Sequence, residues 1–296
     1  MRLALAAIAG LATACRRAPP PPAQPSPAPR PTVSVARPVE VEDGSVPATW
    51  EEVAPGVRWR GALLAFDAPP PAGAITLDRG PASLRWVEFR LDLARVSLVA
   101  ARVAGDDLAR DARALGAIVA VDGGFFEPDR SASGVVVSEG IALAPYRPRG
   151  GSGVLTIANG LADVVASEGF GVDASAGLAA MFAVQCGPRL VERDGSVGIR
   201  RDDGRRAART AACVRDGGRT LDLVVTWDPA DPTRGPGLLH LARRLGGVDG
   251  PAGEPGCERA LNLDGGPSTG AFVRGRWTHR PRGPTPWLLV ARARGP

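Results

Sequence analysis

Residues 236–245 (PGLLHLARRL) and 260–266 (ALNLDGG) contain the pattern from which the fold can be predicted. The first stretch predicts an amphipathic helix with a proline in its first turn and glycines after its end. The second predicts an apolar strand that ends on Asp264, directly before Gly265 and Gly266. Paired glycines let the backbone approach a ligand closely, so this turn places a carboxylate where a site can form.

The same pattern occurs earlier in the chain. Residues 106–115 (DDLARDARAL) predict a helix that stops at Gly116, and residues 117–121 (AIVAV) predict the strand after it. That strand ends on Asp122, again before two glycines. A single Asp-Gly-Gly is most simply a good turn, but two of them after similar units favour one site shared by Asp122 and Asp264.

Outside these units the chain is dominated by short apolar segments separated by Gly, Pro and Asp. Strands are predicted at 57–66, 84–93, 96–103, 179–184, 220–226 and 287–290. Many strands with few helices predict an α+β fold of mixed, mostly antiparallel sheets. We expect one domain over residues 49–296.

The N-terminus is typical of an exported protein. Arg2 precedes the apolar stretch 3–11, and small residues then lead to Cys15. Residues 12–15 (ATAC) resemble a lipobox, in which Cys15 would be lipidated; cleavage after the A-x-A site 12–14 is the alternative. Residues 16–48 are rich in proline and predict an extended linker. We therefore expect an exported protein of the cell envelope, periplasm or extracellular space, with membrane contact only through the N-terminal lipid.

The composition restricts the function. Of 296 residues, 44% are hydrophobic and 23% are charged, values typical of globular proteins. No run of about 18 apolar residues follows the N-terminus, so no membrane-spanning helix is predicted. All 36 basic residues other than histidine are arginines, scattered along the chain, and aromatic residues are only 5%. Nucleic-acid binding is not predicted from this pattern.

Three cysteines follow the N-terminal segment. Cys213 and Cys257 each flank a strand that leads toward the predicted site, so we expect them to form a disulfide, while Cys186 is expected to be a small buried residue. There is no C-x-x-C motif or Cys/His cluster, so a zinc site is not predicted.

Residues 266–270 (GPSTG) fit the G-x-S-x-G pattern of serine hydrolases, with Ser268 as nucleophile. A strand precedes Ser268, but no helix pattern follows, and no acid occurs after Asp264 to partner His279. A serine esterase is therefore the weaker alternative. Arg209 precedes an apolar strand and Arg189 follows a glycine turn, so either guanidinium group could bind a phosphate. Taken alone, each is more simply a solvated surface residue.

Several segments, in order over residues 85–292, resemble the phosphodiester glycosidase family. They are 121–126 (VDGGFF), 134–140 (GVVVSEG), 185–195 (QCGPRLVERDG), 209–211 (RTA) and 261–269 (LNLDGGPST). Asp122 stands where the family usually has asparagine.

The resemblance implies hydrolysis of a sugar-1-phosphodiester in envelope or extracellular glycans. It implies Asp264 as base or nucleophile, Arg209 as the phosphate-binding cation, and Asp122 as a group that positions sugar hydroxyls or water. The expected substrate-binding residues are Asn262, Gly123, Gly124, Arg189, Thr210, Gly265, Gly266, Ser268 and Thr269. No cofactor is predicted, although two carboxylates leave a divalent cation open. A domain that binds anionic polysaccharide without cleaving it is the remaining alternative.

Overall fold

The computed structural model describes residues 38–41, 46–66, 83–172, 181–250 and 253–295. The chain divides into two units, Met1–Ser34 and Val35–Pro296, and all described residues belong to the second. The predicted export signal, Cys15 and most of the predicted linker therefore lie outside the described residues. Within the described ranges, no helix is long and apolar enough to cross a membrane.

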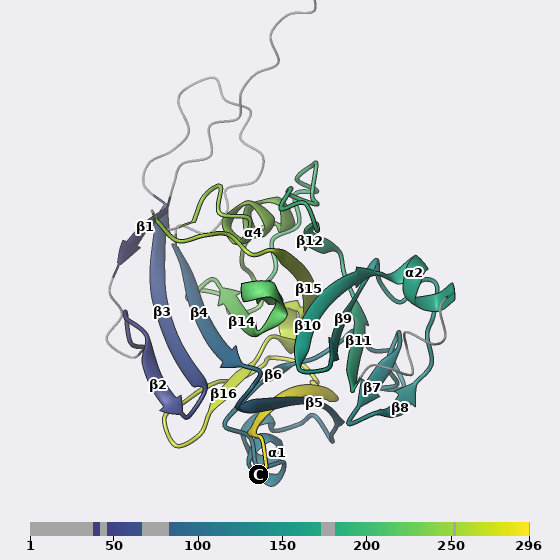
Figure 1. The fold of residues 1–296 in the computed structure, drawn as a ribbon. Coiled ribbons are helices and arrows are strands. Elements are labelled where there is room, and N and C mark those ends of the chain that lie inside the picture. The colour runs from purple at the N-terminus through teal and green to yellow at the C-terminus, as the bar shows by residue number, and fades with distance from the viewer. Residues whose placement is uncertain (1–37, 42–45, 67–82, 173–180, 251–252, 296) are drawn as a thin grey trace, which may run out of the picture. The chain divides into compact units, whose positions relative to one another are not determined.

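The largest sheet has eight strands, all paired antiparallel (Figure 1). In spatial order they are β1 (Pro38–Val41), β3 (Val57–Phe66), β4 (Ser83–Asp92), β14 (Thr220–Trp227), β13 (Arg209–Arg215), β15 (Arg259–Gly265) and β12 (Arg189–Val191), with β2 (Glu51–Ala54) paired to β3. Strand β1 lies within the segment predicted as linker, so the ordered fold begins earlier than the sequence indicates.

The described part of the chain also contains two five-stranded sheets. One has the order β10 (Leu161–Ala166), β9 (Gly153–Ala158), β11 (Phe182–Cys186), β7 (Val136–Ser138), β8 (Ile141–Ala144). The other has the order β17 (Trp277–His279), β16 (Ala271–Val273), β6 (Val119–Asp122), β18 (Trp287–Ala293), β5 (Val96–Arg102). The pairings within both sheets are antiparallel. The predicted α+β class is confirmed.

The helices among the described residues are short. They are α1 (Leu108–Ala114), α2 (Ser167–Val172) and α4 (Leu238–Leu245), with 3₁₀ turns η1 (Asp216–Gly218) and η2 (Gly266–Ser268). Both predicted helices are present, and the Asp107 carboxylate caps α1 by accepting from the Arg110 amide at 3.0 Å. Helix α2 was not predicted. The predicted strand 179–184 appears as β11 from Phe182, and residues 179–180 lie outside the described part.

The large sheet has two buried faces, because residues alternate between them along each strand. We call the inner face the one on which Ala212 and Leu223 join the main core with Val121 of β6. On the outer face, Ala211 and Cys213 pack against residues of α4 such as Leu241 and Leu245. A side chain's position along a strand therefore decides which face it reaches.

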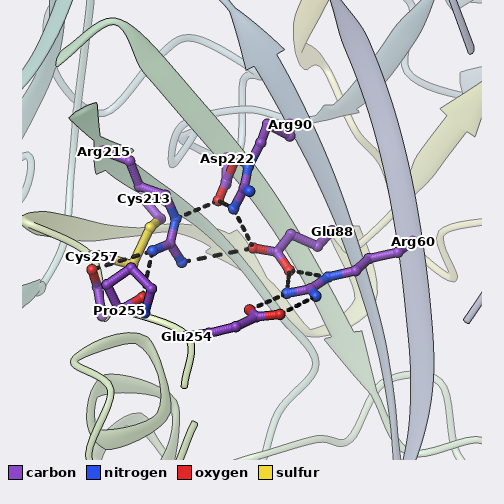
Figure 2. Close-up of polar contacts among 10 residues, drawn as sticks. Arg60, Glu88, Arg90, Cys213, Arg215, Asp222, Glu254, Pro255 and Cys257 are labelled. Atoms are coloured by element: carbon purple, nitrogen blue, oxygen red, sulfur yellow. Dashed lines mark hydrogen bonds and ion pairs between the residues drawn. A yellow bond between two sulfur atoms is a disulfide. The ribbon is translucent and has the colours of Figure 1, made fainter. Parts of the chain in front are cut away.

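The outer face carries a buried network of ion pairs, shown in Figure 2. Arg60 donates to Glu88 at 2.9 and 3.0 Å and also to Glu254. Asp222 is fully buried and accepts from Arg90 and Arg215. Beside this network a disulfide joins Cys213 to Cys257, the pair selected from the sequence (Figure 2). Arg215 also donates to the carbonyls of residues 255 and 256, which fixes the segment before β15.

Candidate functional site

The two Asp-Gly-Gly turns lie next to each other in the structure. Asp122 ends β6, Asp264 lies near the end of β15, and the Asp264 amide donates to the Gly123 carbonyl at 3.0 Å. A Cβ on Gly123 would lie only 3.0 Å from the Trp287 carbonyl oxygen, so glycine permits this close approach of strand ends. The fold thus brings together two carboxyl groups from distant parts of the chain.

Asp122 is fully buried. Its Oδ1 accepts hydrogen bonds from the Thr210 hydroxyl at 2.5 Å and the Gly270 amide at 3.1 Å, whereas its Oδ2 has no partner among the described residues. Burial, and then the charge of Asp264, raise the pKa of Asp122 well above its usual value, although both hydrogen bonds oppose this. Asp122 therefore favours its neutral form.

Asp264 is partly exposed and so can be reached by a substrate. Burial raises its pKa to about 6, while hydrogen bonds from the Gly265 amide and the Ser268 hydroxyl act in the opposite direction. The Ser268 hydroxyl also lies 3.0 Å from the Pro284 carbonyl, and its single proton can serve only one of these acceptors. At neutral pH Asp264 is mostly ionised, and it is the reactive member of the pair.

The Cys186 thiol lies near these carboxyl groups, a position that was not predicted from the sequence. It is fully buried, and burial followed by the charge of Asp264 raises its pKa, so it remains a thiol. Among the described residues, no group of three His, Cys, Asp or Glu side chains could hold a metal ion. A carboxyl group kept neutral, as in Asp122, also suits a divalent cation poorly.

Arg209 and Thr210 lie next to each other on β13, and their side chains point to opposite faces of the sheet. Thr210 points to the inner face, where it contacts Asp122, so its neighbour Arg209 points to the outer face. The charges that act on the Arg209 guanidinium belong to Asp203, Arg205 and Arg206. On β15, Arg209 pairs with Gly265 and Ala211 pairs with Asn262, so the register shift leaves Asp264 beside Arg209. Phosphate binding by Arg209 stays a prediction.

Two other predicted substrate-binding side chains support the local backbone. The Asn262 amide group donates to the carbonyls of Gly187 at 2.9 Å and Leu263 at 2.6 Å. Arg189 donates to the Glu192 carboxylate and, at 2.7 Å, to the Ser152 carbonyl. Because these donors are occupied within the protein, neither side chain is presented as a free donor to the pair.

The glycines differ in their roles. A Cβ on Gly124 would lie 2.9 Å from a Val184 methyl, and one on Gly265 would lie 2.6 Å from the Ala208 carbonyl oxygen. Gly266 has a φ of +61° and open space around it, so it forms the accessible turn beside Asp264. The buried Thr269 hydroxyl has no partner among the described residues.

Ser268 lacks the setting of a hydrolase nucleophile. It lies in η2 and is followed by strand β16, where the nucleophile elbow requires a helix. His279 stacks on Trp227, with ring centroids 3.9 Å apart, and burial lowers its pKa to about 4. The structure therefore gives Ser268 no catalytic partner of the expected kind.

Gln185 is a positioning residue that the sequence motif contained but did not explain. Its side-chain oxygen accepts from the amides of Val135 and Arg147, and its side-chain nitrogen donates to the carbonyls of Arg147 and Gly151. One buried amide group thus joins two loops next to β11. The only sequence signal for this positioning role was that a glutamine directly precedes the Cys-Gly-Pro turn at residues 186–188.

A family described as phosphodiester glycosidase matches residues 115–293. The catalytic domain of zebrafish N-acetylglucosamine-1-phosphodiester alpha-N-acetylglucosaminidase, auto-inhibited by its pro-peptide, has a similar fold, with a TM-score of 0.58 and 17% identity over 84% of this chain and 87% of that one. A hypothetical protein from Synechocystis is similar with a TM-score of 0.55 and 16% identity, over 85% of this chain and 64% of that one. No curated protein matches by sequence.

Proposed function

This chain belongs to the phosphodiester glycosidase family, and we propose that it is a hydrolase that cleaves the bond between a sugar and a phosphodiester. The observation that carries this proposal is the carboxyl pair. Asp264 is accessible and has a pKa of about 6, while Asp122 beside it is buried and favours the neutral form. Carboxyl groups held in different protonation states are typical of glycoside hydrolysis.

In the proposed reaction Asp264 supplies negative charge at the anomeric carbon, as a nucleophile or as the base that activates water. Its pKa near 6 keeps it ionised at neutral pH and still basic enough to accept a proton. Asp122 accepts hydrogen bonds from the Thr210 hydroxyl and the Gly270 amide, and these fix its carboxyl group next to Asp264. Cleavage at the anomeric carbon releases a phosphate monoester, which is a good leaving group, so a strong general acid is less necessary than for an ordinary glycoside.

We also propose that the protein is exported and acts on envelope or extracellular glycans. Residues 1–15 have the pattern of an export signal. The disulfide between Cys213 and Cys257 supports this location, because disulfides persist mainly in oxidising compartments. Lipidation at Cys15 and cleavage after Ala14 remain the two forms of this proposal, with residues 16–37 as the linker and the domain after it.

The test is hydrolysis of a sugar-1-phosphodiester by residues 16–296. Asp264→Asn should lower kcat by about 10³-fold or more, because it removes the reactive charge while keeping the shape. Ser268→Ala should retain activity within about tenfold. Loss with Ser268→Ala alone would support an esterase instead. Tight binding of the substrate without turnover by the unmodified protein would support a polysaccharide-binding domain.

A further inference from the structure

Five large hydrophobic side chains are exposed among the described residues, and four of them lie in or directly beside the sheet of β10, β9, β11, β7 and β8 (Figure 1). These four are Ile141 (65% exposed), Met181 (56%), Leu143 (45%) and Leu161 (45%). The fifth, Val248 (47%), follows α4. Single exposed apolar residues are ordinary, but several on one element mark an interaction surface.

The strand directions bring three of these residues to one end of the sheet. Strands β7 and β9 both pair antiparallel with β11, so they run in the same direction and end on the same side. Ile141 follows β7 and Leu161 follows β9 across two-residue turns. Met181 directly precedes β11, which runs the opposite way and so starts on this side. We call Ile141, Leu161 and Met181 the apolar end.

The two turns place an apolar side chain at the tip of each hairpin. Both residues of each turn have a positive φ, as in a type I′ hairpin: Glu139 and Gly140 in one, Asn159 and Gly160 in the other. The side chain that follows each of these turns is exposed and apolar, where a soluble protein commonly has a polar residue.

Met181 lies between the two hairpins. The Gly140 amide donates to the Met181 carbonyl at 2.9 Å, and the Met181 amide donates to the Ile157 carbonyl at 3.0 Å. In the sheet order, Ile141 and Leu161 each lie two strands away from Met181, on opposite sides of it. Neighbouring strands are about 4.8 Å apart, so the three side chains form a row with a spacing of roughly 10 Å.

The three side chains do not share one face of the sheet. Ile141 pairs with Ser138, which pairs with Phe182, so Ile141 lies on the face of Phe182. Met181 is next to Phe182 in the chain and therefore lies on the other face. Leu161 lies on the same face as Met181, because the residue after Leu161 points into the main core as Phe182 does. A partner on one face would leave part of the row uncovered, whereas a surface that meets the sheet end-on reaches all three residues.

The size of the apolar end favours a lipid surface over a second copy of the chain. Three partly exposed side chains in a row present much less than the about 800 Å² that each partner buries in a stable protein interface. Binding to a membrane surface depends on the apolar area that enters it and needs no matching shape.

Charged groups of both signs border the apolar end. Glu139 lies in one turn. At the other turn, the guanidinium nitrogens of Arg294 lie 3.9 Å from the position that a Cβ on Gly160 would have. The apolar side chains, and not a net charge, should therefore set the affinity.

The chain before the fold can reach a membrane from any side of the domain. The linker predicted over residues 16–37 would span about 70 Å if extended, at about 3.1 Å per residue. A folded unit with the length of Val35–Pro296 has a radius of gyration of about 18 Å. An N-terminal lipid would thus keep the domain near a bilayer without fixing its orientation, and the apolar end is suited to fix it.

We propose that Ile141, Leu161 and Met181 insert into the surface of a lipid bilayer, so that this sheet meets the membrane end-on. The contact is additional to the N-terminal lipid expected from the sequence. It depends neither on lipidation of Cys15 nor on the proposed hydrolysis.

The experiment is co-sedimentation of residues 16–296 with lipid vesicles. This chain contains the whole folded unit and lacks Cys15, so no attached lipid contributes. Vesicles of phosphatidylcholine and vesicles of phosphatidylethanolamine with phosphatidylglycerol should both bind it, also at raised ionic strength. Ile141→Ser, Leu161→Ser and Met181→Gln should each weaken partitioning about tenfold, because each removes an inserted apolar side chain. The matched control is Val248→Ser, which removes a similarly exposed apolar side chain elsewhere and should bind as the unmodified protein does.

The opposite results would overturn the proposal. These are an unmodified protein that does not bind, a triple variant that binds unchanged, or an equal loss in Val248→Ser. Binding only to the phosphatidylglycerol vesicles, with loss at raised ionic strength, would assign the contact to charge instead. Self-association without vesicles that the triple variant abolishes would show that a second copy covers the apolar end. Circular dichroism checks that each variant is folded. Hydrolysis of a small sugar-1-phosphodiester by the triple variant tests the proposed activity separately and should equal that of the unmodified protein.

Discussion

The Thr210 hydroxyl donates a 2.5 Å hydrogen bond to Oδ1 of Asp122, and this contact connects β13 of the large sheet to β6 of another sheet. The connection gives Asp122 a structural role as well as a chemical one. Because burial keeps Asp122 largely neutral, it resembles asparagine in shape and charge, which is the residue that the resemblance to the family leads one to expect at this position.

We predict that Asp122→Asn retains kcat/KM within about tenfold, since the amide oxygen can accept the same two hydrogen bonds. The variant should also be at least as stable as the original protein at pH 8, where a buried carboxyl group is forced toward its charged form. Hydrolysis kinetics and urea unfolding measure the two effects. A loss of activity as large as that of Asp264→Asn would show that Asp122 must carry charge in the reaction.

We expect Thr210→Val to lower the free energy of unfolding by about 1–3 kcal/mol, because it leaves the buried carboxyl group without one donor. Thr210→Ser keeps the hydroxyl and should recover most of this loss. Urea unfolding of both variants measures the difference. Equal destabilisation by valine and serine would assign the effect to packing of the methyl group.

The raised pKa of Asp264 predicts a pH dependence of activity. If the ionised carboxylate reacts, kcat/KM should rise with pH up to about 6 and then level off. The same shift affects stability with the opposite sign. The pKa in the folded state lies above that of the unfolded chain, so the folded state binds more protons and loses stability as the pH rises from about 4 to 6. A kcat/KM that falls through this range would indicate that the neutral carboxylic acid is the reactive form.

The sequence predicted the meeting of Asp122 and Asp264 because each residue ends a strand and precedes two glycines. It could not predict their different protonation states. These follow from the burial of Asp122 against β16 and β13, and the residues adjacent to Asp122 in the sequence do not reveal that burial. The resemblance associates Arg209 and Thr210 with one site. Strand geometry sends these adjacent side chains to opposite faces, so Thr210 contacts Asp122 while Arg209 lies on the other face, beside Asp264 at the shift in register.

The same reasoning explains two further differences. Thr226 was not selected from the sequence because a threonine in an apolar strand is ordinary, and only the register across β13 shows that it lies opposite Arg209. The strand β1 was taken as linker because proline is frequent around it, although a short edge strand tolerates proline.

We predict that Glu88 gives the protein a pH-dependent stability. Burial, followed by the charge of Asp222, raises the pKa of Glu88 to about 7, although Arg60 opposes the shift. The other charged groups in this network are Arg90, Arg215 and Glu254 (Figure 2). The unfolded chain releases this proton near pH 4.5 and the folded chain near 7, so stability should decrease across that interval by about 1–3 kcal/mol.

Glu88→Gln should remove this decrease when the free energy of unfolding is measured from pH 4.5 to 8. Glu254→Gln is the matched control, because the hydrogen bond from Arg60 lowers the pKa of Glu254 and its contribution is instead lost as the pH falls. A Glu88→Gln profile that parallels the original protein over the whole range would reject the assignment to Glu88.

The disulfide between Cys213 and Cys257 should stabilise the domain strongly, because it closes a loop with a sequence separation of 44 residues. For a loop of this length the loss of entropy in the unfolded chain corresponds to about 4 kcal/mol. We expect the double variant Cys213→Ala/Cys257→Ala to lose about that amount of unfolding free energy in urea. We expect no large change in kcat, because the disulfide lies near the start of β15 and Asp264 lies near the end of that strand. Cys186→Ala is the control for removing a buried sulfur that is not bonded. A large loss of kcat in a double variant that is still folded would instead show that the disulfide sets the position of Asp264 along the strand.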